Sequence, residues 1–232
     1  MAAELGEGAA AFQADVGDLD ALQGAADATV ARFGGIDVVV ANAGIAPPSE
    51  PILTIDPGEF ERTVDIDLLG QWRTIRATLP TVIERRGHIL VVASIYSFVN
   101  GALNASYAAS KAGVEQLTRA LRVELAHHQA TAGVAYLGFV ETDLVDDVFA
   151  QQQIAEARSI APQFVTRPIT VNRAARTLVD GVESRAATVA APVWIRPLLP
   201  LRGIAGTLMD EFMLASPALS RAISSAERKQ EQ

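Results

Sequence analysis

The sequence predicts an α/β fold in which helices cover both faces of a doubly wound parallel sheet. Two observations lead to this prediction. Short apolar runs of strand length alternate along the chain with longer segments whose apolar residues recur every three to four positions. The strand-like runs are also almost wholly apolar, which is typical of strands buried on both faces of a parallel sheet.

Composition limits the classes of protein that the chain can belong to. Half of its 232 residues are hydrophobic and a fifth are charged, as in one soluble globular domain. Cysteine is absent, which excludes disulfide scaffolds, thiolate metal sites and cysteine nucleophiles and makes a cytoplasmic location the default expectation. The formal charge of −8 argues against a broad electrostatic contact with nucleic acid.

The first predicted strand is Ala9–Val16, an apolar stretch that ends at a polar turn. An amphipathic helix should follow, because Asp18 or Asp20 can cap its start and Gly34-Gly35 can stop it. The next predicted strand is Ile36–Ala41, which we expect to be buried on both faces.

A long helix is predicted from the capped start at Asp56-Pro57 to about Leu79. The remaining predicted elements are, in order, a strand at His88–Ala93, a helix at about 105–128, a strand at Gly133–Leu137, helices at about 143–158 and 171–184, and a strand at Thr188–Ala191. Polar or glycine residues stand at the carboxyl ends of four strands: Asp15, Asn42, Ser94 and Gly138. Since ligands of such sheets bind beyond these ends, we expect the four segments to meet in one crevice.

The strongest candidates for catalytic side chains lie in the segment Tyr107-Ala-Ala-Ser-Lys111. Residues four apart share a face of a helix, so the Lys111 ammonium can approach the Tyr107 oxygen. A fixed cation favours the phenolate and would let the phenol exchange a proton near neutral pH. Ser94, at a strand end, can donate a hydrogen bond to the same substrate oxygen. A tyrosine and a lysine at this spacing also occur together by chance.

With these residues, the sequence resembles the short-chain dehydrogenase/reductase family. The family's Tyr-x-x-x-Lys pair is similar to Tyr107 and Lys111, and its serine to Ser94. Its Asn-Ala-Gly strand end resembles residues 42–44, its Asp-Val pair resembles residues 15–16, and its nicotinamide loop resembles Gly138–Thr142. The matches extend from about residue 9 to 191. The resemblance implies a Rossmann-like fold.

The resemblance further implies hydride transfer between NAD or NADP and an alcohol, ketone or aldehyde, with the choice of dinucleotide undetermined. Tyr107 would be the acid/base, Lys111 would lower its pKa and hold the nicotinamide ribose, and Ser94 would orient the substrate. The implied cofactor-binding residues are Asp15, Val16, Asn42, Ala43, Gly44, Tyr107, Lys111, Gly138, Val140 and Thr142. A homodimer or homotetramer formed through the two long helices is implied as well.

Two features depart from the family pattern. Asp67 stands where the family has an asparagine that completes its catalytic set, and we interpret Asp67 as a catalytic support residue whose carboxylate alters the electrostatics of Lys111. The family's opening strand–helix–strand unit, with its glycine-rich phosphate turn, has no counterpart before Ala9. We therefore expect that Met1 is an internal methionine and that the natural polypeptide begins roughly 40–50 residues earlier.

Other functions stay open at this point. A degenerate, non-catalytic relative that serves as an interaction partner would also lack the glycine-rich turn. Sugar-nucleotide epimerases share the Tyr-x-x-x-Lys device but tend to be longer. Adjacent histidines at positions 127 and 128 favour a solvated helix end over a metal site. Tyr96 either lines the crevice or packs in the core.

Two regions are predicted: an incomplete Rossmann-type domain at 1–191 and an apolar and basic C-terminal segment at 192–232. Arginines and prolines at 196–202 interrupt the roughly 20 apolar residues that a membrane-spanning helix requires. The apolar stretch Val193–Ala215 can therefore be a substrate lid, an interfacial membrane contact or an oligomer contact. An apolar lid would suit a lipophilic alcohol or ketone.

Overall fold

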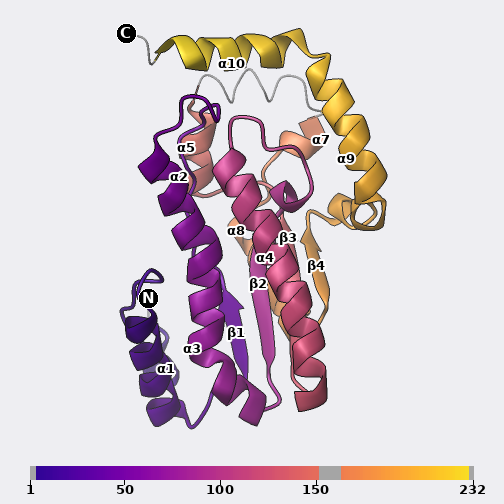
Figure 1. Cartoon of the computed structure of the whole chain (residues 1–232). Coiled ribbons are helices and arrows are strands. Elements are labelled where there is room, and N and C mark those ends of the chain that lie inside the picture. The colour runs from indigo at the N-terminus through magenta and orange to yellow at the C-terminus, as the bar shows by residue number, and fades with distance from the viewer. Residues whose placement is uncertain (1–3, 152–162, 230–232) are drawn as a thin grey trace.

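The computed structural model describes residues 4–151 and 163–229. Within these ranges its sheet has four parallel strands in the order β1-β2-β3-β4. The strands are β1 (Val38–Ala41), β2 (His88–Ser94), β3 (Thr131–Leu137) and β4 (Thr188–Ala191). On one face of the sheet lie α3 (Gly70–Glu84) and α4 (Ala105–Glu124), with α1 (Leu19–Phe33) beside α3, and α8 (Val171–Glu183) lies on the other face (Figure 1). The predicted fold class is confirmed.

Each face of the sheet has its own apolar core. Between the sheet and α3 and α4, residues such as Val91 and Val134 pack with Ile75 and Val114. On the opposite face, a smaller cluster formed by β2, β3 and β4 packs with Leu178 of α8. The central strand β2 is buried along its whole length, as expected for a strand covered on both faces.

The prediction that Ile36–Ala41 is buried on both faces is wrong for the outward side of β1. Val38 and Val40 are 42% and 44% exposed, whereas Val39 and Ala41 are buried. The cause is position, because the cluster under α8 draws its strand residues from β2, β3 and β4 only. The predicted strands of β2, β3 and β4 are confirmed, and β4 has the predicted bounds.

The predicted strand Ala9–Val16 is also wrong. These residues carry no strand assignment and are mostly exposed. A strand exists only through hydrogen bonds to a neighbouring strand, and within the described ranges no strand pairs with this segment. Its end is nevertheless anchored, because Arg73 donates a hydrogen bond to the Val16 carbonyl and the Val16 side chain lies against Gly70.

The helices follow the predicted capping signals. Asp18 accepts hydrogen bonds from two backbone N–H groups in the first turn of α1, and Gly34 ends the helix with a left-handed φ of 83°. The long predicted helix consists of α2 (Pro57–Val64), a π-helical turn (Asp65–Leu69) and α3. Of the predicted helix at 143–158, the structure shows α5 (Asp143–Phe149), while residues 152–158 lie outside the described ranges.

The C-terminal segment forms α9 (Leu198–Leu214) and α10 (Pro217–Lys229). In Figure 1, α10 crosses one end of the molecule, and Arg202 near the start of α9 donates a hydrogen bond to Glu115 of α4. Ala222 and Ala226 of α10 pack on Leu103, in the loop that precedes α4. Among the described residues, no helix combines the length and the apolar character needed to span a bilayer.

Candidate active site

A cleft of about 440 Å³ opens at the carboxyl ends of the strands. The sheet topology brings several predicted site residues together there, because each follows a different parallel strand or lies on α4. The predicted residues that line the cleft are Asn42, Gly44, Ser94, Tyr107, Lys111, Gly138, Val140 and Thr142. Asp67 and Ala43 lie directly behind this lining and contact it through Lys111 and the 42–45 turn.

Tyr107 lies in the first turn of α4 and faces the end of β2. Its hydroxyl makes a hydrogen bond with Ser94, and its ring packs edge-on against Tyr96 with the ring centroids 5.7 Å apart. The Ser94 oxygen also accepts a hydrogen bond from the Tyr96 backbone N–H at 3.3 Å. The predicted meeting of the Tyr107 phenol with the Ser94 hydroxyl is therefore present. Tyr96 also lines the cleft.

The electrostatic environment of Tyr107 differs from the expectation. Burial is the largest cause that raises the pKa of the phenol above its ordinary value, and the Asp67 carboxylate raises this pKa further. The hydrogen bond with the Ser94 side chain acts in the opposite direction and lowers this pKa. The Lys111 ammonium lies over the Tyr107 ring, 5.3 Å from its centroid, and pairs with Asp67. That Lys111 lowers the pKa of Tyr107 stays a prediction.

Lys111 and Asp67 form a buried ion pair. The ammonium nitrogen lies 3.7 Å from the Asp67 Oδ2, and the two side chains are 5% and 0% exposed. Burial lowers the pKa of Lys111 and raises the pKa of Asp67, while the attraction between the two charges opposes both changes. The predicted closeness of a buried carboxylate to Lys111 is confirmed.

The π-helical turn that carries Asp67 also shapes the strand-end turn at residues 42–45. The Ile45 N–H donates a hydrogen bond to the Asp67 Oδ1 at 2.7 Å. A Cβ atom on Gly44 would lie 3.3 Å from both the Asp67 Oδ1 and the Lys111 Nζ, so a side chain there would crowd the ion pair. Glycine at this position keeps the turn close to both charges.

The sequence analysis missed Gln71. Its side-chain amide nitrogen donates a 2.6 Å hydrogen bond to the Ala43 carbonyl, one turn of helix beyond the Asp67 contact. The amide oxygen is buried and has no hydrogen-bond partner among the described residues. The four-residue spacing of Asp67 and Gln71 is the signal that could have indicated this second support of the 42–45 turn.

The opposite wall of the cleft is the loop after β3. The Gly138 N–H donates a hydrogen bond to the Ala191 carbonyl at 2.8 Å, and Val140 forms an isolated bridge with Ile169. Thr142 caps α5 by accepting a hydrogen bond from the Val145 N–H. The side chains that α5 and α8 present to the cleft are aliphatic: Leu144, Val145, Val148, Val171, Ala174, Ala175 and Leu178.

Two predicted cofactor residues lie elsewhere. Asp15 and Val16 are outside the cleft lining, and the Asp15 carboxylate accepts a hydrogen bond from the Gly17 N–H at 2.8 Å. The predicted cofactor-binding residues that line the cleft therefore come from the 42–44 turn, from α4 and from the loop after β3. The ammonium, hydroxyl and backbone donors of the cleft fit a ribose and a carboxamide, and its volume suits the nicotinamide half of a dinucleotide.

The described residues hold no group of three or more potential metal ligands among histidine, aspartate and glutamate. His127 and His128 are exposed and follow α4 in a 3₁₀ turn. These positions agree with the interpretation of a solvated helix end.

Comparisons with known proteins agree with this geometry. Residues 1–153 match the family model described as short chain dehydrogenase. The chain is 35% identical over 147 residues to (-)-trans-carveol dehydrogenase of Rhodococcus erythropolis, which covers 62% of this chain and 52% of the relative. It is 34% identical to 3beta-hydroxysteroid dehydrogenase 1 of Eggerthella lenta, over 76% of this chain and 69% of the relative.

Among solved structures, a short-chain type dehydrogenase/reductase from Mycobacterium marinum has a TM-score of 0.67 and 27% identity, over 77% of this chain and 72% of that chain. By contrast, the matched part of the carveol relative is only about half of that protein's length.

Proposed function

Because the chain belongs to the short-chain dehydrogenase family, we propose that it transfers a hydride between a nicotinamide dinucleotide, NAD or NADP, and an alcohol or carbonyl carbon. One observation carries the proposal. A single cleft joins a half-buried tyrosine, its serine hydrogen-bond partner and a buried lysine at the carboxyl ends of the strands.

Each residue has a distinct role in the proposed reaction. The dinucleotide, when bound, supplies or accepts the hydride. Tyr107 gives a proton to the substrate oxygen during reduction and removes it during oxidation, while Ser94 donates a hydrogen bond to the same oxygen. Lys111 holds the ribose. The raised pKa of Tyr107 keeps the phenol protonated at neutral pH, which supports its role as the proton donor in carbonyl reduction.

The substrate is proposed to be a lipophilic ring alcohol or ketone. The aliphatic side chains of α5 and α8 leave a largely apolar wall opposite Tyr107. Such a wall would bind a hydrocarbon ring and leave its oxygen as the polar group available to Ser94 and Tyr107. The names of two relatives, a carveol dehydrogenase and a 3beta-hydroxysteroid dehydrogenase, refer to ring alcohols and support this class.

Dinucleotide titration and turnover of the purified chain test the proposal. Calorimetric titration with each dinucleotide, followed by reduction of cyclohexanone and a 3-ketosteroid, should show binding and turnover in the wild type. Ser94→Ala should lose turnover by roughly a hundredfold with dinucleotide affinity kept, whereas Lys111→Ala should lose both. A folded wild type that binds neither NAD(H) nor NADP(H) would contradict the proposal and favour a non-catalytic interaction protein.

We also propose a homodimer or homotetramer formed through α3 and α4. This proposal is supported by apolar side chains that are exposed on both helices: Trp72 of α3 is 43% exposed and Val123 of α4 is 76% exposed. Sedimentation equilibrium should give a mass of two or four chains, and Val123→Lys should lower it. A wild type that stays monomeric at high concentration would contradict this assembly.

A further inference from the structure

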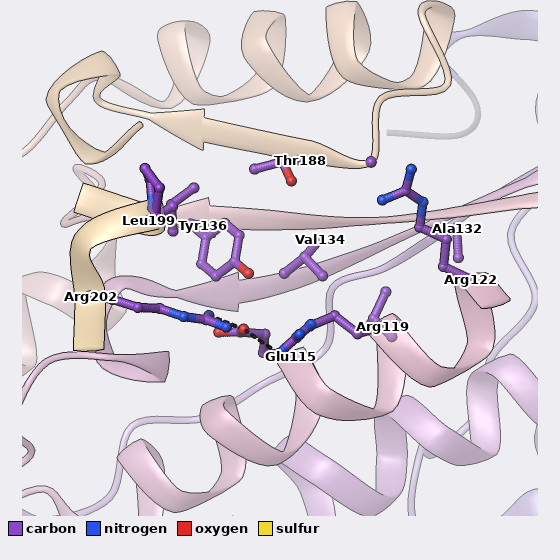
Figure 2. Close-up of a pocket in the computed structure, with 12 residues that line it drawn as sticks. Glu115, Arg119, Arg122, Ala132, Val134, Tyr136, Thr188, Leu199 and Arg202 are labelled. Carbon is purple, nitrogen blue, oxygen red and sulfur yellow. Dashed lines mark hydrogen bonds and ion pairs between the residues drawn. The ribbon is translucent and has the colours of Figure 1, made fainter. Parts of the chain in front are cut away.

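A second pocket of about 290 Å³ lies on the side of the sheet covered by α4. Its floor is β3, and its walls come from α4, the start of β4 and the first turns of α9 (Figure 2). It shares none of its described lining residues with the cleft that contains Tyr107. The proposed hydride transfer therefore makes no use of this pocket.

Positively charged side chains are concentrated at this pocket, although the whole chain is acidic. Three arginines line it, Arg119 and Arg122 from α4 and Arg202 from α9, against one carboxylate, Glu115. The pocket thus has a net charge of about +2 at neutral pH, because arginine stays protonated, while the whole chain carries −8. Such a local reversal of sign attracts small anions.

Glu115 fixes two of the three guanidinium groups. Its buried carboxylate accepts a hydrogen bond from Arg202 and lies 3.7 Å from the Arg119 Nη1. Each guanidinium carries five N–H donors, so one carboxylate leaves most of these donors unused. The ion pairs therefore hold the Arg119 and Arg202 side chains in place and leave N–H groups available to a ligand.

Arg122 is the cation that Glu115 does not hold. Among the described residues it forms no hydrogen bond or ion pair, and Figure 2 shows its side chain extending from α4 toward the start of β4. Thr188 of β4 adds a hydroxyl to the same wall. Val134 and Leu199 give the pocket an apolar side against which a carbon skeleton can pack.

We propose that this pocket binds a small molecule through a phosphate or carboxylate group, with Arg122, Arg119 and Arg202 as its donors. The planar guanidinium forks match either kind of oxyanion through paired hydrogen bonds. The pocket volume lies near the lower end of the range for small-ligand sites, roughly 300–1,000 Å³. A compact metabolite with one anionic group fits this space better than a dinucleotide.

The test is a binding titration on the whole chain. Inorganic phosphate, acetate and chloride are titrated at constant ionic strength, with calorimetry and melting temperature as readouts. Phosphate or acetate should bind saturably with a dissociation constant in roughly the millimolar range, and chloride should not. If phosphate binds more tightly than acetate, the anionic group of the ligand is a phosphate; if acetate binds more tightly, it is a carboxylate.

Three variants locate the site. Arg122→Gln should weaken binding roughly tenfold, since it removes a charge-assisted hydrogen bond at an exposed position. Arg176→Gln, an exposed arginine of α8, is the matched control and should bind like the wild type. Glu115→Gln should tighten binding in a folded variant, because it raises the net charge of the pocket, whereas a purely structural role of the arginines would leave binding unaffected.

Three results would overturn the proposal. They are the absence of saturable binding of either oxyanion, an equal response to chloride, and unchanged binding in Arg122→Gln. None of them bears on dinucleotide binding, which is measured in a separate titration, so this proposal can fail while the proposed function stands.

Discussion

At the residue scale, Asp67 is the least expected member of the site. A fully buried carboxylate costs free energy unless it is paired, and here it is paired with Lys111 and the Ile45 N–H. Its charge acts on both catalytic candidates, because it stabilises the Lys111 ammonium and raises the pKa of Tyr107. Asp67 thereby favours a protonated phenol next to a charged lysine.

Replacing Asp67 by asparagine should shift the pH dependence of alcohol oxidation. Oxidation needs the Tyr107 phenolate, and removing the carboxylate removes one cause that raises the pKa of Tyr107. The rising limb of kcat/KM against pH should therefore move to lower pH in Asp67→Asn. The measurement is the pH profile of oxidation in the two proteins.

The control for this prediction is Asp65→Asn, on the same π-helical turn. Asp65 pairs with Arg73 and is 45% exposed, so its loss should leave the profile in place. A profile that does not move in Asp67→Asn, or that moves to higher pH, would count against a role for Asp67 in setting the acidity of Tyr107.

The sequence identified the chemical groups of the site more reliably than their electrostatics. The four-residue spacing of Tyr107 and Lys111 and the position of Ser94 at a strand end were sufficient to predict that the three residues share one cleft, as they do in the structure. Spacing does not report burial, however, and burial decides the direction of the Tyr107 pKa. Gln71 was not predicted as a site residue, because a glutamine side chain within a helix has many roles that are unrelated to a functional site.

At the element scale, β1 shows the limit of reading burial from an apolar run. Four consecutive apolar residues indicate a strand, but the alternation of exposed and buried positions depends on which layers cover it. The same limit applies to Ala9–Val16, a mostly apolar run that finds no partner strand within the described ranges. Strand formation needs a neighbour that local sequence does not specify.

Paired substitutions in β1 should show the difference in burial between the two faces of this strand. Val39→Ala removes methyl groups from the core and should lower the free energy of unfolding by about 2 kcal/mol. Val40→Ala, at the adjacent exposed position, should change it by less than about 0.5 kcal/mol. Urea denaturation of both variants is the measurement. Equal losses would mean that both faces of β1 are covered in solution.

At the scale of the whole molecule, the chain combines the cleft that contains Tyr107 with a C-terminal segment that forms α9 and α10. Arg202 binds α9 to Glu115 of α4, and Asp210 of α9 accepts a hydrogen bond from Asn100 in the loop before α4. These contacts place α9 between the arginine pocket and the loop that follows Ser94. None of the described residues of α9 lines the cleft that contains Tyr107, so the lid, the membrane contact and the oligomer contact all stay predictions.

The sequence predicted this overall arrangement only in part. Alternating strand and helix patterns predicted all four strands and the common edge where the ligand residues meet, but they also predicted a further strand at Ala9–Val16 that is not formed. The arginine pocket was not foreseen, because its members come from α4, β3, β4 and α9, and only tertiary packing brings them together.

The most direct measurement is single-turnover reduction of a ring ketone by dinucleotide-loaded wild type and Tyr107→Phe. The substitution removes only the hydroxyl that is proposed to give the proton, so dinucleotide affinity should stay within about twofold while the rate falls by roughly a hundredfold or more. If Tyr107→Phe reduces the ketone at the wild-type rate, proton transfer by Tyr107 is excluded and the central claim is contradicted.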